Sequence, residues 1–512
     1  MSCGIAARNF ICMKTDNRNL GIVLLVCAVV AFAFQGSRGI YDTTEGRYAE
    51  GAREMIETGN WMQPQLGYEP HWTKPPLFYW AEGLSMKILG QNEWGLRIPN
   101  AIMALILCGA VYGIAASMWD PKTGLIAAAI FGTSPYVVAG TNTLSTDMML
   151  AGWAGLSVLC YWRGIKSDGG RRRLWTAAMW GATGLGFLTK GPPMLLVTAV
   201  IIIHNIVMRR RGAGIKLFTI EGLGIFAVSG LGWYIASVVT NKGLISYWLK
   251  DEVVNRVASD KFGRHGEWYA VFTLYMPIVL FGAGVWMVAW KDIFAKYKKQ
   301  MTCLGELRRF VAGDDAVLFL AMWLFLPLTI FCVSKSRMPL YLLPIFAPVA
   351  IVLARGMVRA QEELNWKGFW RAFLVTAVVC VAGKGIFAEL NSTRDARAAA
   401  DCFLKPAGDI ESIMLNNHKD FGIQFYFGGR LLRVSSEPNM PMHDGLLADK
   451  INEINSAPRH ELYQIIAKGL GSDDLRDKLE ELGIGYKKEV IGHYCGYIIH
   501  STKTRKTAGE VK

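Results

Sequence analysis

The sequence has little charge for its apolar content and lacks closely spaced cysteines. Charged residues make up 19% of the 512 residues, hydrophobic residues make up 52%, and the mean hydropathy is +0.25. Soluble domains rarely combine these values. The ten cysteines are scattered, and no pair has the spacing of a zinc site. No short repeat or low-complexity segment is evident. These absences argue against a soluble globular protein, a zinc-finger protein and a repeat protein.

Long apolar runs account for the high apolar content of the sequence. A helix needs roughly 20 apolar residues to cross a hydrocarbon core about 30 Å thick, and the sequence predicts about 11 such spans. They lie near 20–37, 99–118, 122–139, 147–163, 174–189, 193–208, 217–239, 269–290, 315–333, 338–354 and 369–387. The first run is long and is followed by a poor cleavage pattern, so we expect a retained helix rather than a signal peptide.

Lysine and arginine are concentrated in short loops between the apolar runs. The formal net charge is +14, but a nucleic-acid partner would require a basic soluble face, and positive-inside bias explains the loops better. The basic loops near 164–173, 209–216, 291–300 and 355–371 fall on one side with the N-terminus, which predicts a cytoplasmic side. An odd number of spans places the C-terminus outside.

The external segments are of two kinds. The first long external loop, about 38–98, contains EGRYAEGAREMIETGNW, whose Glu and Arg residues at helical spacing predict a helix at the membrane interface. After residue 388 the composition becomes that of a soluble domain with charged helices and apolar strands. The predicted organisation is a multi-span membrane domain over 1–387 and a small external α/β domain over 388–512.

Acidic residues follow the first span. Asp42, Glu45 and Arg47 stand in DTTEGRYAE. A carboxylate here could accept the proton of an acceptor hydroxyl, which becomes a better nucleophile as its proton leaves. The structural alternative is that Asp42 caps the interfacial helix while Glu45 pairs with it or with Arg47.

Two external turns repeat a lysine beside a proline pair. Lys74 stands in HWTKPPLFYW and Lys190 in FLTKGPPMLL. Proline fixes the bend, and a lysine beside it could hold a lipid phosphate as a point charge. The alternative is a snorkelling lysine within an aromatic belt. The recurrence of the pattern on one membrane face favours a binding role.

Asp147 opens a predicted span in NTLSTDMMLAGW. A charge at the head of an apolar helix costs free energy unless it is paired or wet. Asp147 is therefore a catalytic candidate, and its alternative role is a helix N-cap.

Further candidates lie in the remaining external loops. Lys335, Arg337 and Tyr341 precede or begin the tenth span. One hypothesis for them is a phosphate clamp. The alternative is ordinary flanking anchors, but the positive-inside rule does not predict basic residues on this side. Arg256 and His265 lie in the second long external loop. A lone histidine in a loop is a weak candidate for a metal ligand.

Several motifs occur in an order that resembles a known family. They are EGRYAEGAREMIETGNWMQPQL, TKPPLFYW, EWGLRIPN, FLTKGPP and SKSRMPLYLLPIFAPVAI, over about residues 38–350. The chain resembles the bacterial aminoarabinose transferases that modify lipid A and, more distantly, the protein O-mannosyltransferases. The resemblance implies the GT-C type of fold, interfacial helices in the first external loop and a site on the periplasmic face of the bacterial inner membrane.

The resemblance also implies roles for individual residues. Lys74, Arg256 and Tyr341 match positions that handle the carrier phosphate, Asp147 and Lys190 lie in motifs that line the site, and Glu45 and Arg47 match the first acidic motif. Two positions depart from the family pattern, because Thr44 replaces an aspartate and Thr73 replaces a glutamate. These departures leave open the acceptor, any divalent metal and the catalytic base; no other cofactor is implied.

The sequence therefore predicts a transferase that moves a sugar from a polyprenyl-phosphate carrier. Its expected partners are that donor, a lipid or protein acceptor and the membrane lipids, with no nucleic acid. Asp42, Glu45 or Asp147 could act as base for a hydroxyl acceptor, whereas a phosphate acceptor is already ionised. A lipid or sugar transporter is the rival class, but transporters place binding groups near the midplane and show internal repeats.

Cys402 and Cys495 are the two cysteines of the predicted external domain, where an oxidising compartment permits a disulfide. Such a bond would stabilise the domain by roughly 4 kcal/mol in the chain-entropy model. Thiol labelling of denatured, unreduced protein should leave both cysteines unlabelled if they are bridged. Free labelling of both would contradict the bond, and a cytoplasmic location for this domain would contradict the span count.

Overall fold

The computed structural model divides the chain into two compact units. Its described residues are 2–41, 44–250, 265–360, 365–390, 394–404, 410–416, 420–429, 431–435, 445–456, 462–468, 470–481, 484–491 and 494–500. Unit 1 comprises 1–35, 72–81 and 97–386, and unit 2 comprises 36–71, 82–96 and 387–512. Unit 2 thus combines segments of the first predicted external loop with the C-terminal region.

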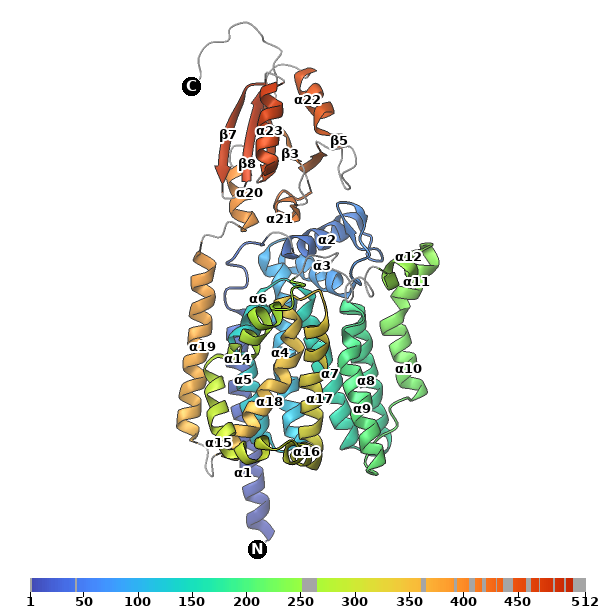
Figure 1. Cartoon of the computed structure of the whole chain (residues 1–512), viewed down its shortest axis with the longest axis vertical. Helices are drawn as coiled ribbons and strands as arrows, with labels where there is room; N and C mark the ends of the chain where they lie inside the picture. The colour runs from blue at the N-terminus through green and yellow to red at the C-terminus, as the bar shows by residue number, and fades with distance from the viewer. Residues whose placement is uncertain are drawn as a thin grey trace. The chain divides into compact units, whose positions relative to one another are not determined.

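Unit 1 is a bundle of helices that run roughly parallel or antiparallel to one another (Figure 1). Its longer helices are α1 (Ser2–Phe32), α4 (Glu93–Met118), α5 (Pro121–Thr133), α7 (Thr146–Ile165), α8 (Gly169–Lys190), α9 (Met194–Arg210), α15 (Ala289–Thr302), α17 (Asp315–Val333), α18 (Leu343–Ala360) and α19 (Trp366–Glu389). The shorter elements are α6 (Pro135–Asn142), α10 (Ile220–Phe226), η1 (Ala227–Leu231), α11 (Gly232–Thr240), α12 (Leu244–Tyr247), η3 (Val271–Tyr275), α14 (Met276–Phe281), η4 (Gly284–Val288), α16 (Leu304–Gly313) and η5 (Pro339–Leu342).

Several helices of unit 1 are suited to crossing a membrane. Among the described residues, five helices are long and apolar enough to span a membrane, or up to seven if each bent pair counts as one span. Helices also lie at 147–163, 174–189 and 193–208, but α9 has only 17 residues and α8 carries Arg171, Arg172, Arg173 and Lys190. The count of 11 spans therefore stays a prediction.

Small residues let the central helices approach closely. The stretch of α5 from Leu125 to Phe131 is at most 4% exposed, so this helix is covered on all sides. A Cβ at Gly155 of α7 would lie 2.2 Å from a methyl carbon of Leu107 of α4. Bundles in lipid depend on such close packing, because lipid chains are as apolar as the helix faces.

A bend between α5 and α6 directs the chain toward the start of α7. The two helices meet at 55°, with Ser134 in extended conformation between them and Pro135 at the first position of α6. Proline has no amide hydrogen to continue the hydrogen bonds of α5. The bend places the turn at 143–145 before the first residues of α7.

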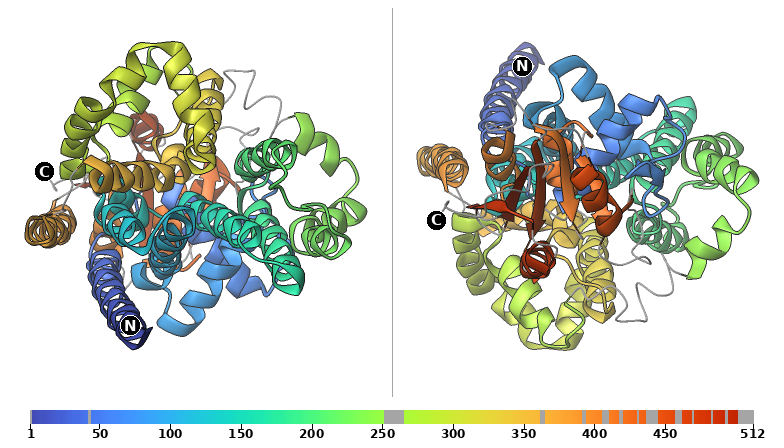
Figure 2. Two further views of the ribbon diagram at one scale, coloured as in Figure 1. Left: turned by 90° about the horizontal axis from the view of Figure 1, so that it is seen from below. Right: turned by 90° about the horizontal axis from the view of Figure 1, so that it is seen from above.

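Unit 2 contains an α/β arrangement around a six-stranded mixed sheet. Its strands are β3 (Ile410–Asn416), β4 (Leu431–Ser435), β5 (Gly445–Leu446), β6 (Leu462–Lys468), β7 (Tyr486–Ile491) and β8 (Tyr494–His500), in the order β5-β4-β3-β6-β8-β7. Helices α20 (Ala396–Leu404), α21 (Phe421–Tyr426), α22 (Leu447–Ser456) and α23 (Leu470–Glu481) connect or flank them. The right-hand view of Figure 2 shows strands of this sheet from above. The side chains of Cys402 and Cys495 lie outside the described set, so their bond stays a prediction.

Helix α2 (Thr44–Thr58) forms where the sequence predicts a helix in the first external loop. It packs against α21, and a Cβ at Gly46 would lie 2.4 Å from the Gly422 nitrogen. The predicted pairing at helical spacing is confirmed, since Arg53 bonds Glu50 at 2.7 Å and Glu57 at 2.5 Å. Much of α2 is buried within unit 2, so its location at a membrane interface stays a prediction.

The rest of unit 2 includes a short hairpin and parts of two helices. Strands β1 (Gln65–Leu66) and β2 (Glu69–Pro70) form the hairpin. The turn between them is fixed by Glu54, whose carboxylate accepts from the Gly67 and Tyr68 nitrogens at 2.6 and 2.8 Å. Helix α3 (Leu77–Leu89) contributes to both units.

Glu82 of α3 is a buried carboxyl group whose protonation affects stability. It is fully buried, and neither oxygen has a hydrogen-bond partner among the described residues. Burial raises its pKa well above 4.5, and the nearby charge of Glu45 raises the pKa further. The folded protein binds this proton more tightly than the unfolded chain does. The free energy of unfolding therefore falls as the pH rises above the pKa of Glu82 in the unfolded chain.

We expect Glu82→Gln to melt at a higher temperature than the wild type at pH 8, because the amide needs no proton to remain neutral. The advantage should shrink toward pH 5, because keeping the folded carboxyl protonated costs less free energy as the pH approaches the unfolded pKa of 4.5. Thermal unfolding of detergent-purified protein across this range measures it. Glu69→Gln, at an exposed position of β2, is the control. A larger advantage at pH 5 than at pH 8 would contradict the prediction.

Candidate active site

A cavity of about 380 Å³ lies within unit 1, where α7 begins and α8 ends. Its wall is mostly apolar and aromatic, with a small number of charged and hydroxyl-bearing residues. The lining residues are Trp72, Thr73, Lys74, Pro75, Asp147, Leu150, Phe187, Lys190, Pro192, Pro193, Leu196, Trp233, Tyr234, Ile245, Trp248, Leu249, Ile330, Phe331, Ser334, Ser336 and Tyr341. Four predicted site residues are thus brought together: Lys74, Asp147, Lys190 and Tyr341.

The two Lys-Pro turns of the sequence line this one cavity. Lys74 and Pro75 come from the segment before α3, while Lys190 and the following proline pair come from the turn between α8 and α9. Gly191 ends α8 with φ +77°, a conformation that favours glycine, and its nitrogen donates to the Phe187 carbonyl at 2.7 Å. The turn chemistry therefore sets the position of Lys190.

Lys190 forms an ion pair with Asp147, and less than a tenth of either side chain is exposed. The Lys190 ammonium also lies 4.4 Å from the ring centre of Tyr341, a distance suited to a cation–π interaction. The N-cap role, the alternative that the sequence offered for Asp147, is wrong. Ser145 is the N-cap of α7, and its hydroxyl accepts from the Asp147 nitrogen at 3.3 Å. Asp147 is the second residue of α7, two positions after the N-cap, and its carboxylate pairs with Lys190.

Lys74 is the second ammonium group of the cavity wall. Its side chain is half-buried, and Nζ donates to the Thr73 carbonyl at 2.8 Å. Thr73 occupies the position where the resembling family has glutamate, so this part of the wall carries a neutral hydroxyl. An ammonium group in an otherwise apolar wall attracts an anion more strongly than one in water, because the local dielectric is lower.

Aromatic side chains form one side of the cavity and were not singled out from the sequence. The ring of Trp233 lies 6.0 Å from that of Trp72 and 5.6 Å from that of Trp248, and Tyr234 lies 4.9 Å from Trp248. The Trp248 indole donates to the Trp72 carbonyl at 2.9 Å, which joins α12's end to the Lys74 turn. Tryptophan near helix ends is common at membrane interfaces, so composition alone does not distinguish this wall from an aromatic belt.

Arg337 holds the backbone of its turn and does not line the cavity. Its guanidinium donates to the carbonyls of His265, Glu267 and Cys332 at 2.8 to 2.9 Å. Lys335 is exposed and is also absent from the lining. The predicted clamp of Lys335, Arg337 and Tyr341 on one phosphate therefore does not form in this structure, because only Tyr341 faces the cavity.

His265 is exposed and has φ +49°. Within the described ranges, no three His, Cys, Asp or Glu side chains gather as a metal site. The predicted residues Asp42 and Arg256 lie outside the described ranges.

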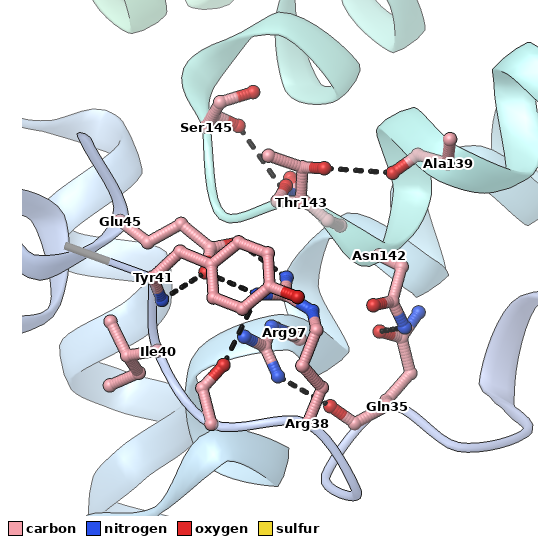
Figure 3. Close-up of polar contacts among 12 residues, drawn as sticks. Gln35, Arg38, Ile40, Tyr41, Glu45, Arg97, Ala139, Asn142, Thr143 and Ser145 are labelled. Atoms are coloured by element: carbon pink, nitrogen blue, oxygen red, sulfur yellow. Dashed lines mark hydrogen bonds and ion pairs between the residues drawn. The ribbon is translucent and has the colours of Figure 1, made fainter. Parts of the chain in front are cut away.

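The acidic motif of the first external loop belongs to unit 2. Arg38 binds Glu45 through two hydrogen bonds of 2.9 and 2.7 Å, and the Tyr41 nitrogen donates to the same carboxylate at 2.8 Å (Figure 3). Glu45 is 3% exposed. Burial lowers the pKa of Arg38, but the Glu45 charge and hydrogen bonds outweigh it, so the net pKa is raised. These contacts fix the chain between α1 and α2. Arg47 lies half-buried on α2.

In unit 1, Arg97 and Asn142 bind Gln35, which lies in the turn after α1. Arg97 is fully buried and donates to the Gln35 carbonyl at 3.1 Å, and Asn142 donates to the Gln35 side chain at 3.1 Å (Figure 3). These bonds connect α4 and α6 to the turn after α1. Arg97 of the EWGLRIPN motif therefore holds this turn.

Comparison with known proteins gives consistent likenesses. A family model described as dolichyl-phosphate-mannose-protein mannosyltransferase matches residues 73–233. An undecaprenyl phosphate-α-4-amino-4-deoxy-L-arabinose arabinosyl transferase of Photorhabdus laumondii is 28% identical over 67% of this chain and 61% of the relative. The transferase of the same name from Pseudomonas savastanoi is 27% identical over 71% of this chain and 65% of the relative. The chain thus spans less than two thirds of the length of these curated relatives.

Solved structures support the fold. The crystal structure of ArnT from Cupriavidus metallidurans bound to undecaprenyl phosphate has a TM-score of 0.74 at 17% identity, covering 93% of this chain and 97% of that protein. The apo form of an oligosaccharyltransferase from Archaeoglobus fulgidus has a TM-score of 0.51 at 12% identity, covering 88% and 69%. The predicted resemblance and the GT-C type of fold are confirmed. Identities this low establish the fold alone.

The Asp147–Lys190 pair can be tested by removing each partner and then both. We expect Asp147→Asn and Lys190→Met each to destabilise the protein by about 3 kcal/mol, because each leaves one buried charge without its partner. The double variant should regain most of that loss. Thermal unfolding in detergent gives the three values. Additive losses in the double variant would show that the two side chains do not stabilise each other.

Proposed function

We propose that the chain is a glycosyltransferase that moves a sugar from a polyprenyl-phosphate carrier to an envelope acceptor at the periplasmic face of the bacterial inner membrane. The observation that carries this proposal is one cavity that combines two lysines with a large apolar and aromatic wall. A lipid-linked donor has the same two parts, an anionic phosphate and a prenyl chain. The named relatives act with such a carrier.

The two lysines are suited to the carrier phosphate. Lys74 and Lys190 enter the cavity from separate turns, and each can contact a phosphate as a point charge, Lys190 while it also pairs with Asp147. The aromatic wall of Trp72, Trp233 and Trp248 offers the apolar surface that the first prenyl units require. Phe187 and Ile330 extend this surface.

In the proposed reaction, an acceptor oxygen forms a bond to the anomeric carbon while the bond from that carbon to the phosphate oxygen breaks. The bonding electrons leave with the phosphate, and nearby ammonium groups stabilise the charge that develops there. A hydroxyl acceptor must also give its proton to a base. The Asp147 carboxylate is engaged by Lys190, and this favours an acceptor that is already ionised, such as a phosphate on a glycolipid of the lipid A kind.

The arrangement of charge along the bundle supports the proposed orientation. Lysine-rich α15 and arginine-containing α16 lie at the end of the bundle away from the beginning of α7 and the end of α8 (Figure 1). Basic loops mark the cytoplasmic side of membrane proteins, so the cavity would face the periplasm. Eleven crossings would carry the chain to a periplasmic α/β domain after residue 387.

Protein O-glycosylation is the second candidate function. The observation that favours it is the match of 73–233 to the protein mannosyltransferase description. Transport is less consistent with the structure, because the cavity lies at helix ends whereas transporter sites lie near the midplane. Mass spectrometry of envelope lipids and glycoproteins from cells with and without the gene would identify the acceptor. An unchanged mass profile for lipids, other envelope glycans and proteins would contradict both transferase proposals.

Lys74→Ala should abolish sugar transfer while the protein remains folded in the membrane, because the Lys74 ammonium stabilises the negative charge that develops on the leaving phosphate. Transfer from a polyprenyl-phosphate donor by purified protein measures the effect. Lys242→Ala is the matched control, since Lys242 is exposed after α11 and does not line the cavity. Full activity of Lys74→Ala at normal expression would contradict the assignment.

A further inference from the structure

Ser336 lies in the cavity wall and has a hydroxyl group that the proposed chemistry does not use. It is 5% exposed, and its side-chain oxygen has no hydrogen-bond partner among the residues that the structure describes. Leaving a buried hydroxyl unpaired costs free energy, and native proteins rarely do so without a reason. Ser334, two residues earlier in the same wall, differs: its hydroxyl bonds the Ser336 backbone nitrogen and carbonyl at 3.3 and 3.4 Å.

The backbone around Ser336 is held from several directions. Arg337 binds three carbonyl groups, two of them from residues 265 and 267. The Tyr136 hydroxyl donates to the Pro339 carbonyl at 2.6 Å, and the Tyr341 nitrogen donates to the Met338 carbonyl at 3.2 Å. The position of Ser336 is therefore fixed before a ligand enters. Its side chain has a single torsion with three staggered positions, so the hydroxyl can turn to a ligand without backbone movement.

The chemistry of the hydroxyl indicates which part of a donor it would contact. Charged groups of the wall, Lys74 and Lys190, suit the phosphate, and the aromatic residues suit the prenyl chain. A serine hydroxyl is neutral and both donates and accepts a hydrogen bond. A sugar hydroxyl has the same two capacities.

We propose that Ser336 determines donor specificity by hydrogen-bonding one hydroxyl group of the donor sugar, a role that rests on the proposed glycosyltransferase function. The bond gives the protein a means to distinguish a sugar with that hydroxyl from one without it. A site with a polar group prepared for a substrate hydroxyl discriminates against the analogue that lacks it, because the polar group is then left unpaired.

The test uses the full-length protein with undecaprenyl-phosphate-linked sugars: a donor that the wild type uses and its analogues that each lack one hydroxyl. Ser336→Ala should lower kcat/KM for the parent donor about three- to tenfold, the value of one neutral hydrogen bond. For one deoxy donor, the wild type should show the same lowered kcat/KM that Ser336→Ala shows for the parent donor. Ser336→Ala should have the same kcat/KM for that deoxy donor as for the parent donor. Affinity for sugar-free undecaprenyl phosphate should remain unchanged.

Three outcomes would overturn the proposal. Ser336→Ala could retain wild-type kcat/KM for the parent donor, it could distinguish every deoxy donor as the wild type does, or it could weaken binding of sugar-free undecaprenyl phosphate to the same extent. Ser117→Ala, which removes a hydroxyl bonded to the Gly113 carbonyl of its own helix at 2.6 Å, controls for a general loss of stability. Failure of the wild type to transfer sugar from any such donor would instead count against the proposed function itself.

Discussion

Lys190 and Asp147 meet at the end of an apolar helix bundle, with less than a tenth of either side chain exposed. Placing two charges there is costly unless each neutralises the other, and removing one partner costs more than the pair gains. The pair therefore restricts how α7 and α8 can be arranged, since one charge stands in the first turn of α7 and the other in the last turn of α8. Tyr341 lies over the Lys190 ammonium and connects η5 to the same point. The cavity is formed around this fixed cluster.

Part of this site could be predicted from the sequence. Lys74 and Lys190 stood out because the same Lys-Pro chemistry occurs twice on one predicted face of the membrane, and both lysines line the cavity. Asp147 stood out because a charge at the head of an apolar helix needs a partner, and its partner is Lys190. The structure brings these side chains to one cavity because local residue type and topology together restrict their positions, while their roles in binding and catalysis stay predictions.

Other features depend on contacts that no local pattern contains. Arg337 appeared suited to phosphate, but its guanidinium binds carbonyl groups about 70 positions earlier, at His265 and Glu267. Helix α2 was predicted at an interface, and it packs on α21, far along the chain. The tryptophans of the cavity wall have the composition of an ordinary interfacial belt. In each case the partner is brought by tertiary folding. The helix positions could be predicted more fully, because apolar runs of spanning length are a local property.

The account depends on the cavity being the place where a carrier phosphate binds. The most direct measurement is an experimental structure of the full-length protein with undecaprenyl phosphate bound in a lipid nanodisc. We expect phosphate density within hydrogen-bond distance of Lys74 or Lys190 and prenyl density along Trp72, Trp233 and Trp248. Phosphate density elsewhere, with the cavity containing no ligand, would contradict the account.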